Sequence, residues 1–247
     1  MSLADLLDEL EAAKDPEKAG PMEAYMRYQF PFLGIAGPER NALYKKYFPE
    51  AKKTKIIGWD FVDTCWEKEP REYQYVGANY LKAMQSYLTE SDLPKLERLV
   101  VTKSWWDTVD ILDRVVGSLV YDKPKLGEII LPWSLSDNIW LRRVAIDHQL
   151  LRKEKTDVHL MKKILLNNLD QTEFFINKAI SWALRDYSKT NPDWVARFIE
   201  KIRKAWLNSV SRKLASTFSI IEKRIHDLKK VARLCYNRLY LKNFKEK

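Results

Sequence analysis

Apolar residues recur at helical spacing along most of this chain, and this regularity limits the possible folds more than any other feature. Leu3, Leu6, Leu7 and Leu10 follow the i, i+3, i+4, i+7 pattern that places side chains on one face of a helix. Similar stripes lie in residues 56–66, 80–88, 96–100, 109–116, 141–148, 161–165 and 175–183. Prolines separate many of these stripes, and few segments alternate as a strand would. We therefore expect about a dozen helices joined by short loops.

Polar residues that can cap a helix precede several stripes, at residues 91–94, 136–138 and 190–192. Pairs of predicted helices recur at a spacing of roughly 35–45 residues, which is typical of HEAT-like repeats. The predicted fold is thus all-α, a HEAT-like helical repeat solenoid. Such a stack has a concave face formed by one helix of each pair, where a long ligand would lie.

Composition excludes several classes of protein. The chain has 7 glycines, against the roughly 17 that average usage would give, which disfavours Gly-rich phosphate loops. No apolar run approaches the ~18 residues of a membrane span, and the amino-terminal segment lacks a signal-peptide pattern. The cysteines and histidines show no metal-ligand or redox spacing (Cys65, Cys235, His148, His159 and His226). We expect a cytoplasmic protein that binds no membrane, metal or cofactor.

The formal net charge of +9 suggests a nucleic acid or another anionic surface as partner. However, residues 201–247 contain 14 Lys/Arg and 3 Asp/Glu, whereas residues 1–200 contain 29 and 31. All of the excess positive charge is therefore in the last fifth of the chain. A case for DNA binding must depend on local groups of residues.

Trp106 and Asp110 form the most specific of these groups. They are separated by four residues and so share a helix face. An aromatic ring beside a carboxylate is a plausible cradle for a cationic substrate, because both attract positive charge. The alternative is a core tryptophan next to a solvated helix charge.

Three further groups have both a functional and a structural interpretation. Arg143 follows Trp140 on one predicted helix face and suits phosphate recognition, or else a surface ion pair. Trp182, with Lys178 four residues before it and Arg185 three residues after it, is either a binding residue or part of the core. The aromatic run of residues 25–35 is more typical of a packed helix–loop junction than of a site.

Together these segments resemble the AlkD-like family of bacterial alkylpurine DNA glycosylases, which are HEAT-like repeat proteins. The resemblance extends from about residue 3 to 200 and rests on the order and spacing of several segments rather than on one motif. The matching residues are Tyr25-Met26, Phe30-Pro31-Phe32-Leu33-Gly34-Ile35, Pro38-Glu39-Arg40, Ser104-Trp105-Trp106-Asp107-Thr108-Val109-Asp110, Trp140-Leu141-Arg142-Arg143-Val144-Ala145, Lys178-Ala179-Ile180-Ser181-Trp182 and Tyr187-Ser188-Lys189-Thr190-Asn191-Pro192.

The resemblance implies hydrolysis of the N-glycosidic bond of cationic purines, alkylated at N3 or N7, in double-stranded DNA. It assigns the catalytic carboxylate to Asp110, the aromatic cradle to Trp106 and Trp182, the phosphate contact to Arg143 and a supporting role to Tyr25. Because no lysine nucleophile stands out, we expect a monofunctional enzyme without lyase activity. The family is thought to act without full base extrusion, so bulky adducts should be tolerated, and a monomer is the simplest expectation.

Two alternatives from other classes remain. One is a non-catalytic HEAT-repeat relative that recognises DNA structure, and the other is a protein-interaction solenoid. Loss of Asp110 or of a cradle tryptophan would favour the first, but both tryptophans and the aspartate are present.

The resemblance stops near Ala205, which divides the chain into residues 1–204 and a basic tail of residues 205–247. One permitted set of codons for residues 205–218, read in another frame, nearly restores the family's usual ending. The tail is therefore either a frameshift product, in the gene or in its sequencing, or a genuine basic helical extension that binds DNA phosphates or packs on the last repeat.

Overall fold

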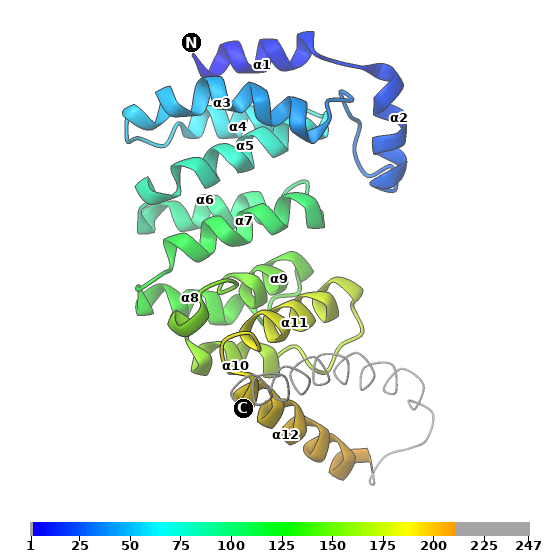
Figure 1. Ribbon diagram of the computed structural model, residues 1–247, viewed down its shortest axis with the longest axis vertical. Coiled ribbons are helices and arrows are strands. Elements are labelled where there is room, and N and C mark those ends of the chain that lie inside the picture. The colour runs from blue at the N-terminus through cyan, green and yellow to red at the C-terminus, as the bar shows by residue number, and fades with distance from the viewer. Residues whose placement is uncertain (1, 211–247) are drawn as a thin grey trace, which may run out of the picture. The chain divides into compact units, whose positions relative to one another are not determined.

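The structure, a computed structural model, describes residues 2–210 and is entirely helical over that range (Figure 1). Twelve α-helices and three short 3-10 helices are found there, and no strand. This confirms the all-α prediction. Most of the predicted tail lies outside the described residues, and the boundary at residue 204 stays a prediction.

The chain forms two compact units, Met1–Ile130 and Leu131–Lys247. Unit 1 contains α1 (Leu3–Ala12), α2 (Pro16–Tyr25), α3 (Gly37–Lys53), α4 (Trp59–Glu67), α5 (Arg71–Met84), η1 (Gln85–Tyr87), η2 (Glu90–Asp92), α6 (Leu93–Val101), α7 (Trp106–Leu119) and most of α8 (Pro124–Trp133). The described part of unit 2 contains α9 (Ile139–Asp147), η3 (Lys153–Lys155), α10 (Val158–Leu166), α11 (Phe174–Tyr187) and α12 (Pro192–Val210).

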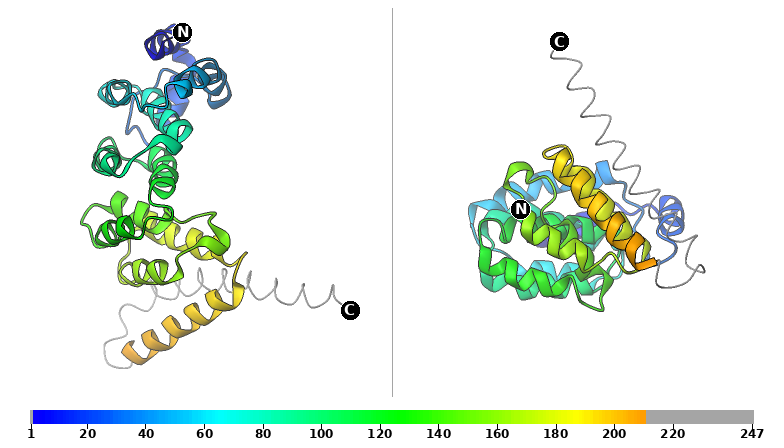
Figure 2. Two further views of the ribbon diagram at one scale, coloured as in Figure 1. Left: turned by 90° about the vertical axis from the view of Figure 1, so that its left-hand side faces the viewer. Right: turned by 90° about the horizontal axis from the view of Figure 1, so that it is seen from below.

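Unit 1 is built as two rows of helices. In one row α1 packs on α3, α3 on α5, and α5 on α7 (Figure 1). In the second row α4 pairs with α5 and α6 pairs with α7, and Figure 2 shows these helices nearly end-on. Between the rows lies an apolar core whose members include Val62, Leu81, Leu96 and Leu112, all fully buried.

The helix pairs recur regularly along the chain. The helices α5, α7, α9 and α11 begin 35, 33 and 35 residues apart in turn. In unit 2, α9 packs against both α10 and α11, and α11 packs against α12. The helical-repeat prediction is therefore confirmed, with spacings at or just below the lower limit of the expected 35–45 residues.

Local sequence signals explain where several helices begin. Asn138 caps α9 by accepting hydrogen bonds from the backbone N–H groups of Trp140 and Leu141. Asn191 likewise accepts from the N–H of Trp194 in the first turn of α12. Residues 91–94 were expected to supply a side-chain cap to α6, but no side-chain cap hydrogen bond forms there. Asp92 accepts hydrogen bonds from the N–H of Thr89 and from the indole of Trp59 instead.

One predicted helix begins later than its apolar stripe indicated. The stripe of residues 56–66 begins at Ile56, but α4 begins only at Trp59 and the Ile56 side chain is 72% exposed. The chain turns before α4, since Lys55 has a φ of 55°. Among the described residues, no helix is both long enough and apolar enough to cross a membrane.

Candidate active site

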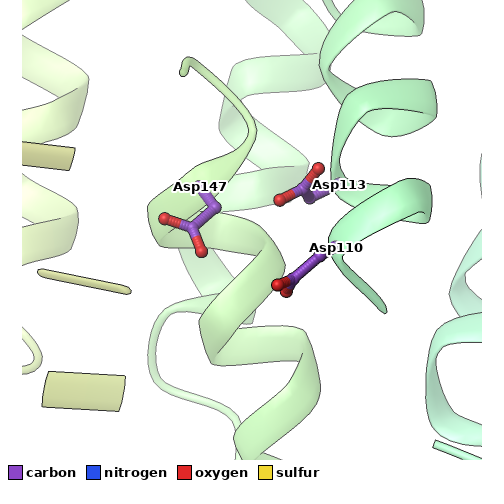
Figure 3. Close-up of side chains that lie close together, drawn as sticks. All are labelled: Asp110, Asp113 and Asp147. Atoms are coloured by element: carbon purple, nitrogen blue, oxygen red, sulfur yellow. The ribbon is translucent and has the colours of Figure 1, made fainter. Parts of the chain in front are cut away.

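The first turn and a half of α7 carries the Trp106 and Asp110 pair. Trp106 is the first residue of the helix, and the preceding Trp105 is extended, with φ −156° and ψ 161°. Asp110 follows one turn later, and both side chains are partly exposed. Asp113, one further turn along α7, is 1% exposed and forms an ion pair with Arg114 at 3.2 Å. Figure 3 shows Asp110 and Asp113 projecting from the same side of α7.

Tyr25 lies against Trp106 within unit 1. Their rings meet edge to face, with centroids 6.2 Å apart and planes at 78°. Tyr25 is the last residue of α2, and its side chain remains 72% exposed. The chain reverses immediately afterwards through Arg27 and Tyr28, both with a φ of 55°. The aromatic run is thus the helix–loop junction that was expected, but one ring of it also joins the candidate site.

A buried arginine that the sequence did not single out holds the start of α7. Arg71 is fully buried, and its Nε and Nη2 atoms donate to the two carboxylate oxygens of Asp107 at 3.0 and 2.5 Å. Asp107 also accepts a 2.5 Å hydrogen bond from the hydroxyl of Tyr75. Burial, and then the Asp107 charge, raise the pKa of Tyr75, so the hydroxyl stays protonated as a donor.

Unit 2 brings Arg143 and Trp182 together. Arg143 on α9 is 1% exposed, and its guanidinium carbon lies 5.0 Å from the ring centroid of Trp182 on α11. Its Nη1 donates to the carbonyl of Phe175 at 2.7 Å, and its Nη2 lies 3.9 Å from Asp147 at the end of α9. Lys178 approaches the same indole ring, with its Nζ 5.9 Å from the centroid. The predicted framing of Trp182 by a cation is therefore present.

The five predicted residues thus fall into two groups, one in each unit. Tyr25, Trp106 and Asp110 belong to unit 1, and Arg143 and Trp182 belong to unit 2. Trp182 is partly exposed, so it is not a purely internal core residue. Arg143 makes internal contacts rather than the surface ion pair of the alternative interpretation.

Comparison with known proteins relates most of the chain to one family. The family model described as "DNA alkylation repair enzyme" matches residues 6–229, a range that crosses the predicted boundary at residue 204. A solved structure titled "Predicted DNA alkylation repair enzyme from Enterococcus faecalis" is 37% identical. That alignment covers 76% of this chain and 89% of the other, with a TM-score of 0.69. No functionally curated protein matches the chain.

Proposed function

Because this chain belongs to the DNA alkylation repair enzyme family, we propose that it is a monofunctional DNA glycosylase. Its substrates would be cationic purines alkylated at N3 or N7 in double-stranded DNA. The observation that carries the proposal is the start of α7, where Asp110 lies one turn after Trp106 and the ring of Tyr25 meets that indole. An aromatic wall beside a carboxylate suits a substrate that gains positive charge as it reacts.

Asp110 has a direct role in this chemistry. The alkylated purine is already cationic, so the bond between C1′ of the sugar and the purine nitrogen breaks without a proton donor. The bonding electrons neutralise the purine, and positive charge develops on the deoxyribose. The Asp110 carboxylate stabilises that charge and orients a water molecule, whose oxygen bonds to C1′ while its proton leaves to the carboxylate or to solvent. The products are a neutral alkylpurine and an abasic site.

The remaining residues bind the DNA around this reaction. Trp106 and Trp182 would pack against the sugar and backbone, whose C–H groups become more positive in the transition state, and Tyr25 would support Trp106. Arg143 would contact a phosphate. Through its contacts with the Phe175 carbonyl and with the Trp182 ring, it would also order one side of that indole.

The test uses a duplex containing 7-methylguanine, with release of the free base and binding of the duplex measured separately. We expect wild-type protein to bind and to release the base, and Asp110→Asn to bind with similar affinity and release it far more slowly. Binding without release by the wild type would instead identify a non-catalytic DNA-binding relative. Neither binding nor release would favour a protein-interaction solenoid.

The same assay tests the tolerance of bulky adducts. A series of N3 and N7 adducts of increasing size should be released at comparable rates if the lesion is held without full extrusion. Rejection of the bulky members would contradict that part of the proposal. The monomeric state and the cytoplasmic location stay predictions.

A further inference from the structure

The buried start of α5 carries two opposite charges next to each other. Arg71 and Glu72 are both 0% exposed, and the six residues after them are buried as well. A charge removed from water is tolerated only when it is paired or fully hydrogen-bonded. The partners of these two residues therefore show which parts of the fold they hold in place.

All four side-chain hydrogen bonds of Arg71 reach residues 103–108, which comprise the end of the loop before α7 and the first turn of that helix. Besides its two bonds to Asp107, the guanidinium donates to the Lys103 carbonyl at 2.7 Å and to the Thr108 hydroxyl at 2.8 Å. These partners lie on both sides of Trp106 in the chain. The ring of Phe30 covers the guanidinium, with its centroid 3.8 Å from the guanidinium carbon. The planar group thus has one fixed orientation.

Glu72 holds the loop that is tied to α2, the helix that carries Tyr25. Its carboxylate accepts three backbone hydrogen bonds, from the N–H groups of residues 33, 34 and 35, at 2.9, 2.9 and 3.1 Å. This loop is tied to the start of α2, because the Leu33 carbonyl accepts the N–H of Asp15 at 2.8 Å. Helix α2 ends at Tyr25. Consecutive residues of α5 therefore fix the helix that carries Tyr25 and the helix that carries Trp106.

We propose, on the basis of the proposed glycosylase function, that Arg71 is a positioning residue for Trp106 and Asp110. Its two-point pairing with Asp107 fixes both the place and the rotation of the first turn of α7, and Asp110 lies three residues further on. A lysine offers one point charge in place of the planar fork. It would preserve the ion pair but not the orientation.

The variants Arg71→Lys and Arg98→Lys test this role. Arg98 forms an exposed ion pair with Asp63 in the same unit and serves as the matched control. We expect Arg71→Lys to lower the single-turnover rate of 7-methylguanine release about 10- to 100-fold, with the Kd for the duplex changed less than 3-fold. Arg98→Lys should change both by less than 2-fold. A purely structural defect would lower the rate only in proportion to the folded fraction, measured by circular dichroism.

Chemical rescue supplies a second readout. Guanidinium ion at millimolar concentration should restore part of the lost rate in Arg71→Ala and should leave the rates of the wild type and of Arg98→Ala unchanged. If Arg71→Lys or Arg71→Ala fails to fold, Tyr75→Phe decides the question, since it removes only the hydroxyl that donates to Asp107. We expect that variant to release the base 3- to 10-fold more slowly.

Three results would overturn the inference. They are a normal rate in folded Arg71→Lys, a normal rate in Tyr75→Phe where Arg71→Lys does not fold, and a rate loss matched by an equal loss of DNA affinity. These results are distinct from failure of the proposed function. An inactive wild type would refute the glycosylase and this inference together, whereas an active wild type with fully active variants would refute only the role of Arg71.

Discussion

Each unit contains a buried arginine close to a tryptophan, but the two arginines act on different parts of their surroundings. In unit 1, Arg71 binds the side chains and backbone that flank Trp106 and is covered by Phe30. In unit 2, Arg143 faces the Trp182 ring itself and donates to the Phe175 carbonyl. The first arrangement fixes the start of a helix, and the second fixes the face of one side chain. Their loss should therefore have different consequences.

The largest expected effect concerns the loop that Glu72 holds in unit 1. Gly34 has a φ of +90°, and a Cβ at this position would lie 1.9 Å from the Asp15 carbonyl oxygen. We expect Gly34→Ala to lower the free energy of unfolding by about 3 kcal/mol or more, because both the backbone and the neighbouring carbonyl must shift. Chemical denaturation measures this change.

Gly20 within α2 is the matched control, since a Cβ there meets nothing within 4 Å. Gly20→Ala should leave stability unchanged or raise it by up to about 1 kcal/mol. Equal effects of the two substitutions would show that the loop does not restrain unit 1 in the way described.

A second prediction concerns the stability of unit 2 in acid. His148 is the buried residue that directly follows α9, with its Nδ1 2.7 Å from the Ala145 carbonyl. Burial, and then the positive charge of Arg152, lower its pKa from 6.5 to about 3. The unfolded chain binds this proton below pH 6.5, whereas the folded chain does so only near pH 3. The free energy of unfolding is therefore unaffected by this group above pH 6.5. It decreases as the pH falls, by about 2 kcal/mol at pH 5.

The free energy of unfolding, measured between pH 7.5 and 5, tests the direction of this pH dependence. His148→Gln should have a shallower pH dependence than the wild type, and substitution of the exposed His159 should not change it. A wild-type stability that rises on acidification through this range, with no difference in His148→Gln, would contradict the account.

The third prediction separates the two possible roles of Arg143. If Arg143 contacts a phosphate, Arg143→Met should reduce the slope of log Kd against log salt concentration by about 0.9, because one counterion fewer is released. Arg98→Met should leave the slope unchanged. An unchanged slope in Arg143→Met, together with slower base release, would restrict Arg143 to ordering Trp182.

Sequence periodicity predicted most of the fold because a buried face repeats every 3.6 residues and many prolines stand at helix starts, although Pro49 and Pro132 lie inside α3 and α8. Leu6 and Leu10 of α1 are buried as predicted. It failed at Ile56, where an apolar residue lies in the turn before its helix and is mostly exposed. Periodicity reports which residue types recur, and it does not report where the backbone leaves a helix.

The candidate site was predictable only in its pairings along one helix and in the residues that the family resemblance supplied. Trp106 and Asp110 are four residues apart, so their shared helix face follows from the sequence. Arg71 and Glu72 were missed because their partners lie more than 30 residues away, and an Arg-Glu pair at a helix start resembles a solvated surface pair. The one sequence signal for this ion pair was Asp107, which lies in segment 104–110 of the family resemblance but had no role assigned to it.

The most direct test of the account is the reaction at Asp110. Methylated duplex DNA is incubated with excess wild-type protein or Asp110→Asn, and free 7-methylguanine and abasic sites are counted in the same sample. The account predicts equal amounts of both products from the wild type. In folded Asp110→Asn, which still binds the duplex, the single-turnover rate should be 10²- to 10³-fold lower, the usual cost of removing one group that stabilises a transition-state charge. Equal rates in the two proteins would contradict the assignment of Asp110 as the catalytic carboxylate.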